Sequence, residues 1–170
     1  MRVLHAGCGN EHLPPEYGFG KCDEVRLDID PTMNPDIVAS IVDLGDVGEF
    51  DAVYCSHALE HLYPHQVPQA LAEFRRVLKP GGYALIFVPD LEDVRPTEDV
   101  LYESNAGPVS GLDLIYGHHK FTVDRPYMAH HCGFTSLTLG RALTEAGFNE
   151  VHTRRIENFC HNLMAVAKVN

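Results

Sequence analysis

Two short motifs near the start of the chain contain residues that could bind a nucleoside cofactor. The first, Gly7-Cys8-Gly9, directly follows an apolar run at 3–6, and the second, Asp28, belongs to the run EVRLDID at 24–30. Glycines at the end of a strand let the main chain come close to a ligand. A carboxylate about twenty residues further on can accept hydrogen bonds from both hydroxyls of a ribose. We therefore expect a nucleoside cofactor at the carboxyl ends of these two strands.

The glycine pair is not the fingerprint of a dinucleotide site. His12 stands where that fingerprint requires its third glycine. The difference fits a ligand that has no pyrophosphate. An ordinary tight turn after a strand is the alternative explanation of the two glycines, and a helix cap or a solvated strand end is the alternative for Asp28.

Histidines are the second group of residues that could do chemistry. His57, Glu60 and His61 form the pattern H-x-x-E-H, which in one class of zinc proteases places two ligands on one face of a helix. Pro64 limits a helix at this place. Histidines that cap a turn after a strand explain the same pattern without a metal ion, so we predict no metal here.

A denser cluster lies within the fifteen residues from 118 to 132. Its imidazoles and one thiol could ligate zinc or copper, bind a substrate, act as a general base, or occupy an ordinary loop. Adjacent histidines do not easily ligate one ion together, so we again predict no metal. The catalytic candidates are the four histidines of this cluster, His118, His119, His130 and His131.

The hydrophobic pattern predicts the elements that must position these residues. Apolar and β-branched runs predict strands at 3–6, 24–30, 36–42, 50–55, 83–88, 150–156 and 162–169. From Pro64 the period becomes helical, and a Lys-Pro-Gly-Gly sequence at 79–82 ends the helix, whose inner face carries Val67, Leu71, Phe74 and Leu78. A second helix is predicted at 136–146. The connections among the first four strands are too short for full helices.

The stretch from 90 to 134 shows no clear period. Glycines and prolines interrupt it, and it collects histidines together with the aromatic residues Tyr102, Tyr116, Phe121 and Tyr127. So long an irregular segment in a compact domain is usually a lid or a binding loop. We expect it to cover a bound substrate, and we call residues 90–134 the lid segment.

Length and composition limit the class of protein. The 170 residues, 45% of them apolar, predict one domain over 1–170 with a sizeable core. A net charge of -11 without a long basic run argues against a nucleic-acid partner. Five cysteines without C-x-x-C spacing suit a reducing cytoplasm, and no apolar run has the length of a membrane span. We expect a soluble cytoplasmic protein without membrane contact.

Residues 2–89 resemble the class I S-adenosylmethionine-dependent methyltransferases. The segments that carry the resemblance occur in the order of the family: VLHAGCGN (3–10), LDIDP (27–31), DIVASIVDL (36–44), FDAVYCSHALEHL (50–62) and FRRVLKPGGYALIFVPD (74–90). The resemblance implies a Rossmann-like α/β fold. Its mostly parallel seven-stranded sheet would end in a C-terminal antiparallel hairpin, here with a reduced number of helices.

The same resemblance implies S-adenosylmethionine as the cofactor and assigns residues to its parts. The residues near its amino-acid end are His5, Ala6, Gly7, Cys8 and Gly9, although His5 stands where many family members have an acid. Asp28 and Ile29 would lie at the ribose and Asp43 and Leu44 beside the adenine. The methionine portion would face Cys55, Ser56 and His57.

The function that follows is methyl transfer to a small-molecule acceptor. Such chemistry needs alignment of donor and acceptor in a dry pocket more than it needs reactive side chains. The alternatives are a cofactor-binding module without catalysis and a metal-dependent hydrolase with histidine ligands. Because a parallel sheet is normally covered on both faces, the missing crossover helices also predict a homodimer or larger assembly.

Overall fold

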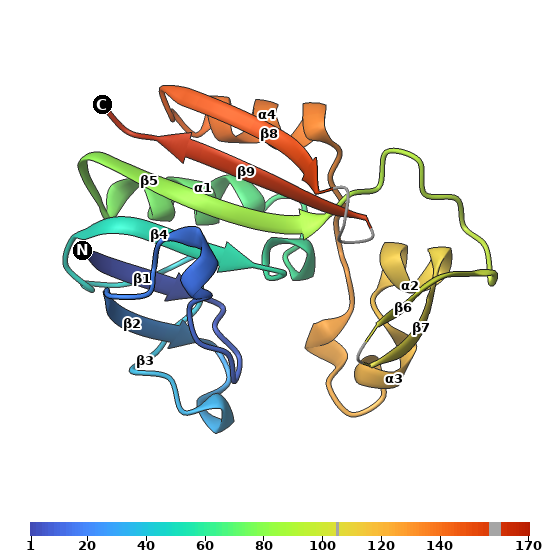
Figure 1. Ribbon diagram of the computed structural model, residues 1–170. Helices are drawn as coiled ribbons and strands as arrows, with labels where there is room; N and C mark the ends of the chain where they lie inside the picture. The colour runs from blue at the N-terminus through green and yellow to red at the C-terminus, as the bar shows by residue number, and fades with distance from the viewer. Residues whose placement is uncertain (105, 157–160) are drawn as a thin grey trace.

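The protein is built around one seven-stranded sheet (Figure 1). The computed structural model describes residues 1–104, 106–156 and 161–170, so Cys160 lies outside the described residues. The strands run in the spatial order β3-β2-β1-β4-β5-β9-β8. Their bounds are β1 (Arg2–Ala6), β2 (Asp23–Asp28), β3 (Ile37–Val38), β4 (Phe50–Ser56), β5 (Leu78–Pro89), β8 (Glu150–Ile156) and β9 (Asn162–Lys168).

The strands pair in the parallel and antiparallel directions that the predicted fold requires. β1 pairs in parallel with β2 and β4, and parallel pairing continues to β3 on one side and to β5 on the other. β9 is antiparallel to both β5 and β8. The expectation of a mostly parallel seven-stranded sheet with a C-terminal antiparallel hairpin is confirmed.

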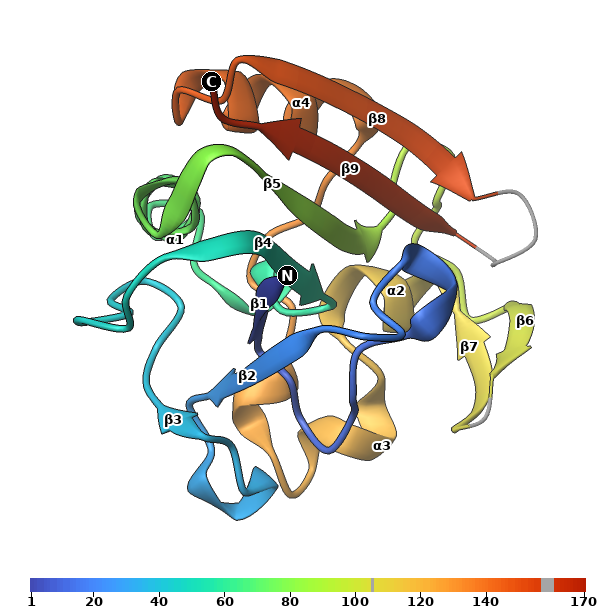
Figure 2. The ribbon, with the colours of Figure 1, turned by 60° about the vertical axis from the view of Figure 1, so that its left-hand side comes forward.

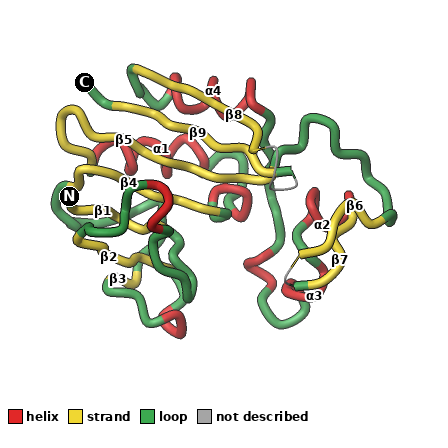
Figure 3. Tube along the Cα trace, viewed as in Figure 1, coloured by secondary structure: helices red, strands yellow, loops and turns green. Residues whose placement is uncertain are grey.

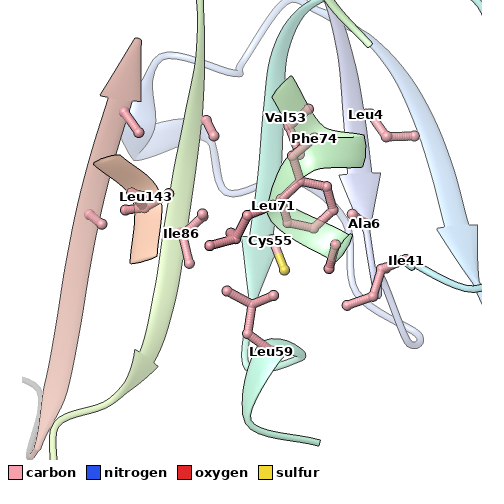
Figure 4. Close-up of a cluster of buried hydrophobic side chains, with 14 of the residues drawn as sticks. Leu4, Ala6, Ile41, Val53, Cys55, Leu59, Leu71, Phe74, Ile86 and Leu143 are labelled. Carbon is pink, nitrogen blue, oxygen red and sulfur yellow. The ribbon is translucent and has the colours of Figure 1, made fainter. Parts of the chain in front are cut away.

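Two helices cover one face of the sheet. α1 (Val67–Arg76) and α4 (Ser136–Glu145) lie behind the strands in Figure 1, and the main hydrophobic core fills the space between. Figure 4 shows Leu71 and Phe74 of α1 and Leu143 of α4 among side chains of the central strands. Phe74 and Leu143 are fully buried. The 3.6-residue pattern of the sequence therefore marks the faces that hold both helices to the sheet.

The end of α1 differs from the sequence prediction. The helix ends at Arg76, and Leu78, predicted on its inner face, begins β5 opposite Phe50. The Pro-Gly-Gly sequence at 80–82 lies within the strand, where the pairing register with β4 shifts. Gly81, with a φ of 79°, donates its N–H to the carbonyl of Val169. The sequence at 80–82, expected to end a helix, thus forms a bulge within β5, and its backbone still hydrogen-bonds to the chain that follows β9.

The third strand is much shorter than the predicted range 36–42. Only Ile37 and Val38 pair with β2, because β2 itself ends at Asp28 and leaves no partner beyond that point. The N–H of Ala39 still donates to the carbonyl of Asp28. Residues after Val38 are therefore free to turn toward the end of the sheet.

The early connections contain no α-helix among the residues that the structure describes, as predicted. They hold the short 3₁₀ turns η1 (Pro15–Tyr17) and η2 (Pro31–Met33). The segment 10–22 lies over the face opposite α1 and α4, and Figure 2 shows it from the side. Its Leu13, Tyr17 and Phe19 pack against the alternate residues of β1, β4 and β5.

The lid segment has more regular structure than its sequence suggests (Figure 3). It contains the hairpin β6 (Val100–Ser104) and β7 (Gly107–Ser110), the helices α2 (Gly111–Tyr116) and α3 (His119–Thr122), and the turn η4 (Pro126–Met128). Ser110 and Asp113 form a capping box at the start of α2, a signal that the sequence did contain.

Both ends of the lid segment lie at the same point of the fold. Asp90 and Phe134 form a parallel bridge, and the N–H of Leu91 donates to the carbonyl of Phe134 over 2.9 Å. Asp90 is fully buried and pairs with Arg155 of β8 over 2.6 Å. The lid segment therefore leaves the sheet and returns to it through one anchored pair of residues.

Among the helices of the described ranges, none is both long enough and apolar enough to span a bilayer.

A small change in the core should have a measurable effect. Ile86 of β5 is fully buried between the sheet and the two helices. Ile86→Val removes one methylene, and we expect it to lower the free energy of unfolding by about 0.5–1.5 kcal/mol in urea titrations. Ile29→Val makes the same chemical change at a site that is 64% exposed and should leave the unfolding midpoint nearly unchanged. Equal unfolding midpoints for the two variants would contradict the burial of Ile86 in this core.

Candidate functional site

A cavity of about 370 Å³ opens at the carboxyl ends of β1, β2 and β4. The sheet order reverses between β1 and β4, and ligands of open α/β sheets bind outside the strand ends at such a point. Residues that follow each of these strands line the cavity, and residues of the lid segment close it. We call it the strand-end cavity.

The glycine loop forms one wall of the strand-end cavity. Gly7 has a φ of 70°, and a Cβ at this position would lie 2.7 Å from the Cβ of Ala58. Any side chain here would therefore clash with the segment that follows β4. The N–H of Gly7 donates to the carbonyl of Leu27, which holds the loop against the end of β2.

Asp28 braces the loop from the other side. Its Oδ2 accepts the N–H of Gly9 over 2.8 Å, and its Oδ1 accepts the N–H of Asp30 over 2.9 Å. The carboxylate also lines the strand-end cavity. Each carboxylate oxygen can accept a further hydrogen bond, so Asp28 can bind a hydroxyl-bearing ligand while it shapes the loop.

The structure brings most, but not all, of the predicted cofactor residues to this cavity. The lining includes Gly7, Cys8, Gly9, Asp28, Ile29, Ser56 and His57. The side chains of the other five lie outside it. Ala6, Leu44 and Cys55 are in the hydrophobic core. Asp43 accepts the N–H of Gly45 in a turn.

His5 has a structural role on the opposite face of the sheet. It is 3% exposed, and its Nδ1 lies 2.9 Å from Oε1 of Glu24. Glu24 also binds Nδ1 of His12 and the N–H of Leu13. Desolvation lowers the pKa of His5 in spite of the nearby carboxylate. His5 thus helps to fasten the segment 10–22 to β2.

Several lining residues were not predicted. Ala39, Ser40 and Ile41 reach the cavity because β3 ends early and the chain turns toward the strand ends. The remaining unpredicted lining residues are Glu11, Ala58, His61, Leu62, Tyr127 and Met128. The H-x-x-E-H pattern was a signal for His61, whereas the place of Tyr127 depends on the fold of the lid segment.

Tyr127 fastens the lid segment to the end of β2. Its hydroxyl donates to Oδ2 of Asp30 over 2.7 Å, and this hydrogen bond raises the pKa of Tyr127. The two residues are 97 positions apart in the sequence. The contact holds Tyr127 and Met128 over the strand-end cavity.

Loss of this contact should loosen the cover of the cavity. If the cavity binds the cofactor that the resemblance implies, Tyr127→Phe should weaken the binding of its product S-adenosylhomocysteine by about two- to tenfold in calorimetric titrations, since one exposed hydrogen bond is lost. Tyr116→Phe removes a hydroxyl from a residue that is 63% exposed and lies outside the lining, and serves as the control. Equal affinity in both variants would show that the Tyr127–Asp30 contact does not support ligand binding.

A second cavity of about 380 Å³ lies under the lid segment and shares His57, His61 and Met128 with the first. We call it the lid cavity. Of the four candidate histidines, His118 and His130 line it. His119 instead binds Oδ1 of Asp113 over 2.7 Å, and the ring of His131 stacks on Tyr63 at 4.3 Å. The remaining lining includes the aromatic rings of Tyr102 and Phe121.

His57 stands between the two cavities and is paired with Glu60. The Nδ1 of His57 lies 3.1 Å from Oε1 of Glu60, whose side chain is 1% exposed. His57 has a φ of 52°, a conformation that directs the chain sharply after β4. Desolvation opposes the charged imidazolium, but the hydrogen bond and the charge of Glu60 raise the pKa of His57 above its usual 6.5. A buried carboxylate thus orients and polarises an imidazole at the site.

Comparison with known proteins decides the family. Residues 1–153 match the family model described as a methyltransferase domain. The chain belongs to the methyltransferase family. This methyltransferase has the Rossmann-like class I fold.

Solved structures share the fold of the methyltransferase. The S-adenosylmethionine-dependent methyltransferase of Mesorhizobium loti is 18% identical with a TM-score of 0.69, over 98% of this chain and 90% of that one. The 1,6-didemethyltoxoflavin-N1-methyltransferase of Burkholderia thailandensis, solved with 1,6-didemethyltoxoflavin and S-adenosylhomocysteine, is 17% identical with a TM-score of 0.65. That match covers 99% of this chain and 70% of the other.

A curated relative matches a short part of the methyltransferase. "Probable methyltransferase ltbC" of Aspergillus luteorubrus is 56% identical over 34 residues, which are 19% of this chain and 12% of that protein. The match therefore spans only a small fraction of the relative's length.

Proposed function

We propose that this methyltransferase transfers a methyl group from S-adenosylmethionine to a small-molecule acceptor bound in the lid cavity. The observation that carries the proposal is the pair of adjoining cavities, one at the glycine loop and one under the lid segment, with His57 common to both. The volume of the lid cavity lies at the small end of the usual range for ligand sites. The Burkholderia thailandensis enzyme was solved with a small-molecule substrate, which supports an acceptor of this class.

In this proposal the cofactor occupies the strand-end cavity. Gly7, Cys8 and Gly9 contact its amino-acid end, and Asp28 with Ile29 holds the ribose. The resemblance assigned the adenine to Asp43 and Leu44. We propose instead that Ser40 and Ile41 contact it, since they line the cavity.

We further propose His57 as the general base that accepts a proton from the acceptor. A base oriented by a buried carboxylate is the arrangement that activates nucleophiles in many enzymes. Ser56 and His57 also lie next to the expected methionine portion, where the methyl group is transferred. The Glu60 side chain fixes the ring of His57 without contact with solvent.

His118 is proposed to bind the acceptor rather than to act as the base. Its Nδ1 accepts the N–H of Lys120 over 3.2 Å, so its Nε2 carries the hydrogen. That Nε2 is buried without a hydrogen-bond partner among the described residues. An acceptor with a carbonyl, hydroxyl or ring nitrogen would satisfy it. His119 and His131 lie outside the lid cavity, so we assign them no part in the reaction.

The test is turnover with a panel of small hydroxylated and nitrogen-heterocyclic acceptors. We expect formation of S-adenosylhomocysteine with at least one acceptor, and its loss in a His57→Asn variant. Tight binding of the cofactor without turnover on any acceptor would favour the alternative of a binding module. Hydrolysis that stops with a chelator would favour the hydrolase.

We also propose that the protein forms a homodimer or larger assembly in the cytoplasm. α1 and α4 lie on one face, while the other carries Tyr83, Met164 and Val166, which stay partly exposed although they pack against the cluster that includes Leu13 and Phe19. An apolar sheet surface of this kind is rarely left to water. The proposed cytoplasmic location rests on the five cysteines of the sequence, whose spacing suits a reducing compartment.

Light scattering at micromolar concentration should therefore give at least twice the chain mass of 18.9 kDa. Met164→Lys places a charge on the proposed interface and should shift the mass toward the monomer. Leu137→Lys introduces the same charge on α4, at the other face of the sheet and at a residue that is 72% exposed, and is the control. A monomeric wild-type protein would contradict the assembly.

A further inference from the structure

Three side chains at the edge of the lid cavity have no role in the proposed methyl transfer beyond the pairing of Glu60 with His57. One carboxylate oxygen of Glu60 and one ring nitrogen each of His61 and His130 lie within 4.8 Å of one another. Glu60 and His61 belong to the turn η3 (Leu59–His61) after β4, and His130 belongs to the lid segment. All three line the lid cavity.

Glu60 has an oxygen without a hydrogen-bond partner in a buried place. Its Oε1 is used by His57, while its Oε2 is buried and unpartnered among the described residues. The side chain is 1% exposed, so bulk water does not replace the missing partner. A buried carboxylate oxygen without a partner lowers the stability of the folded protein unless a cation or a hydrogen-bond donor binds it.

The Nδ1 atoms of the two histidines have the backbone partners that metal-binding histidines often have. The Nδ1 of His130 lies 2.8 Å from the carbonyl oxygen of Leu114, and the Nδ1 of His61 lies 3.2 Å from that of Ala129. Because a carbonyl can only accept, each Nδ1 carries the hydrogen and each Nε2 keeps its lone pair. Metal-binding histidines typically donate their second ring nitrogen to a carbonyl or carboxylate in this way.

The neighbouring cluster of Asp113, His118 and His119 is similar in size but differs in chemistry. The carboxylate of Asp113 is already occupied, by the capping box of Ser110 at Oδ2 and by His119 at Oδ1. The oxygens of Asp113 therefore already accept hydrogen bonds around the N-terminus of α2. Only the first cluster combines a free buried oxygen with two imidazoles of the correct tautomer, within the residues described.

The sequence patterns at 57–61 and 118–132 predicted no metal, but on the contacts above we propose that Glu60, His61 and His130 bind one divalent transition-metal ion of the Zn²⁺ type. Two imidazoles and one carboxylate are a frequent ligand set of zinc sites that keep a fourth position open. Here the open position faces the lid cavity, where an oxygen or nitrogen of the acceptor would coordinate. This last role rests on the proposed function, whereas the metal site itself does not. The ion would also cross-link the lid segment to the end of β4.

The experiment is a titration of chelator-stripped, full-length protein with Zn²⁺ by calorimetry, and with Co²⁺ as a visible probe, in the absence of methyl donor. We expect one ion per chain in the wild type. His61→Ala, His130→Ala and Glu60→Gln should each weaken binding by at least about tenfold. His131→Ala is the matched control, since His131 adjoins His130 in sequence but stacks on Tyr63, and it should bind as the wild type does.

Melting curves of the stripped variants identify any loss of fold. His130→Gln, which keeps a polar side chain, replaces His130→Ala if the latter unfolds. Equal zinc binding by the wild type and the three ligand variants would overturn the proposal, as would the absence of stoichiometric binding by the wild type. If zinc binding is weakened in His119→Ala alone, the ion binds at the Asp113 cluster, and this result would also overturn the proposal. Because no turnover is measured, failure of the metal site and failure of the proposed function are distinguishable.

Discussion

Asp28→Ala should weaken the binding of S-adenosylhomocysteine by about 30-fold to 1000-fold. The variant loses a carboxylate that can accept charge-assisted hydrogen bonds from a ribose, a loss of about 2–4 kcal/mol. It also loses the brace between Gly9 and the end of β2, so part of the effect will come from the loop. Calorimetric titration measures the affinity directly.

Two further variants separate these contributions. Asp28→Asn keeps the shape and one acceptor oxygen, and an intermediate loss is expected. Asp23→Ala removes a carboxylate from the opposite end of β2, where it is largely exposed, and should bind the cofactor product as the wild type does. Unchanged affinity in folded Asp28→Ala protein would rule out the assignment of Asp28 to the ribose.

His57→Asn should lower turnover by about 10²-fold to 10⁴-fold, the contribution of a well-placed general base. Asparagine is chosen because it tolerates the positive φ of this position better than alanine does. Affinity for S-adenosylhomocysteine should change much less than turnover. His152→Asn makes the same substitution at an exposed position of β8 and is the control.

The pH dependence tests the pairing with Glu60. A base acts in its neutral form, so activity should rise with pH through the pKa of His57, which Glu60 raises above 6.5. In metal-free protein, Glu60→Gln removes that charge, and the midpoint of the acidic limb of the pH–activity profile should move to lower pH. A midpoint that does not move, in a variant that still folds and turns over, would show that His57 is not the titrating base.

The parts of the site that follow a strand directly could be predicted from the sequence. Gly7 and Asp28 each come after an apolar run, and parallel strands bring such positions to one edge of the sheet. Ser56 ends β4 and His57 follows it, so both reach the same edge of the sheet. In these cases a local pattern is sufficient, because the strand itself carries the residue to the site.

Residues whose place depends on packing could not be predicted in this way. The resemblance placed Asp43 beside the adenine, after a strand predicted to reach Val42, but only Ile37 and Val38 of that strand pair with β2. The four lid histidines are alike in sequence. The contact of His119 with Asp113 and the stacking of His131 on Tyr63 place these two rings outside the lid cavity. Contacts between segments far apart in the chain therefore determine which of these side chains reach a cavity.

The anchored pair formed by Asp90 and Phe134 has a consequence for how this enzyme can diversify. Because both ends of the lid segment meet, the length of chain between them can change without moving the glycine loop or Asp28. A doubling of a flexible loop costs only about 0.6 kcal/mol in closure entropy. If the strand-end cavity holds the methyl donor as proposed, insertions and deletions between Asp90 and Phe134 can remodel the lid cavity while the glycine loop and Asp28 remain constant.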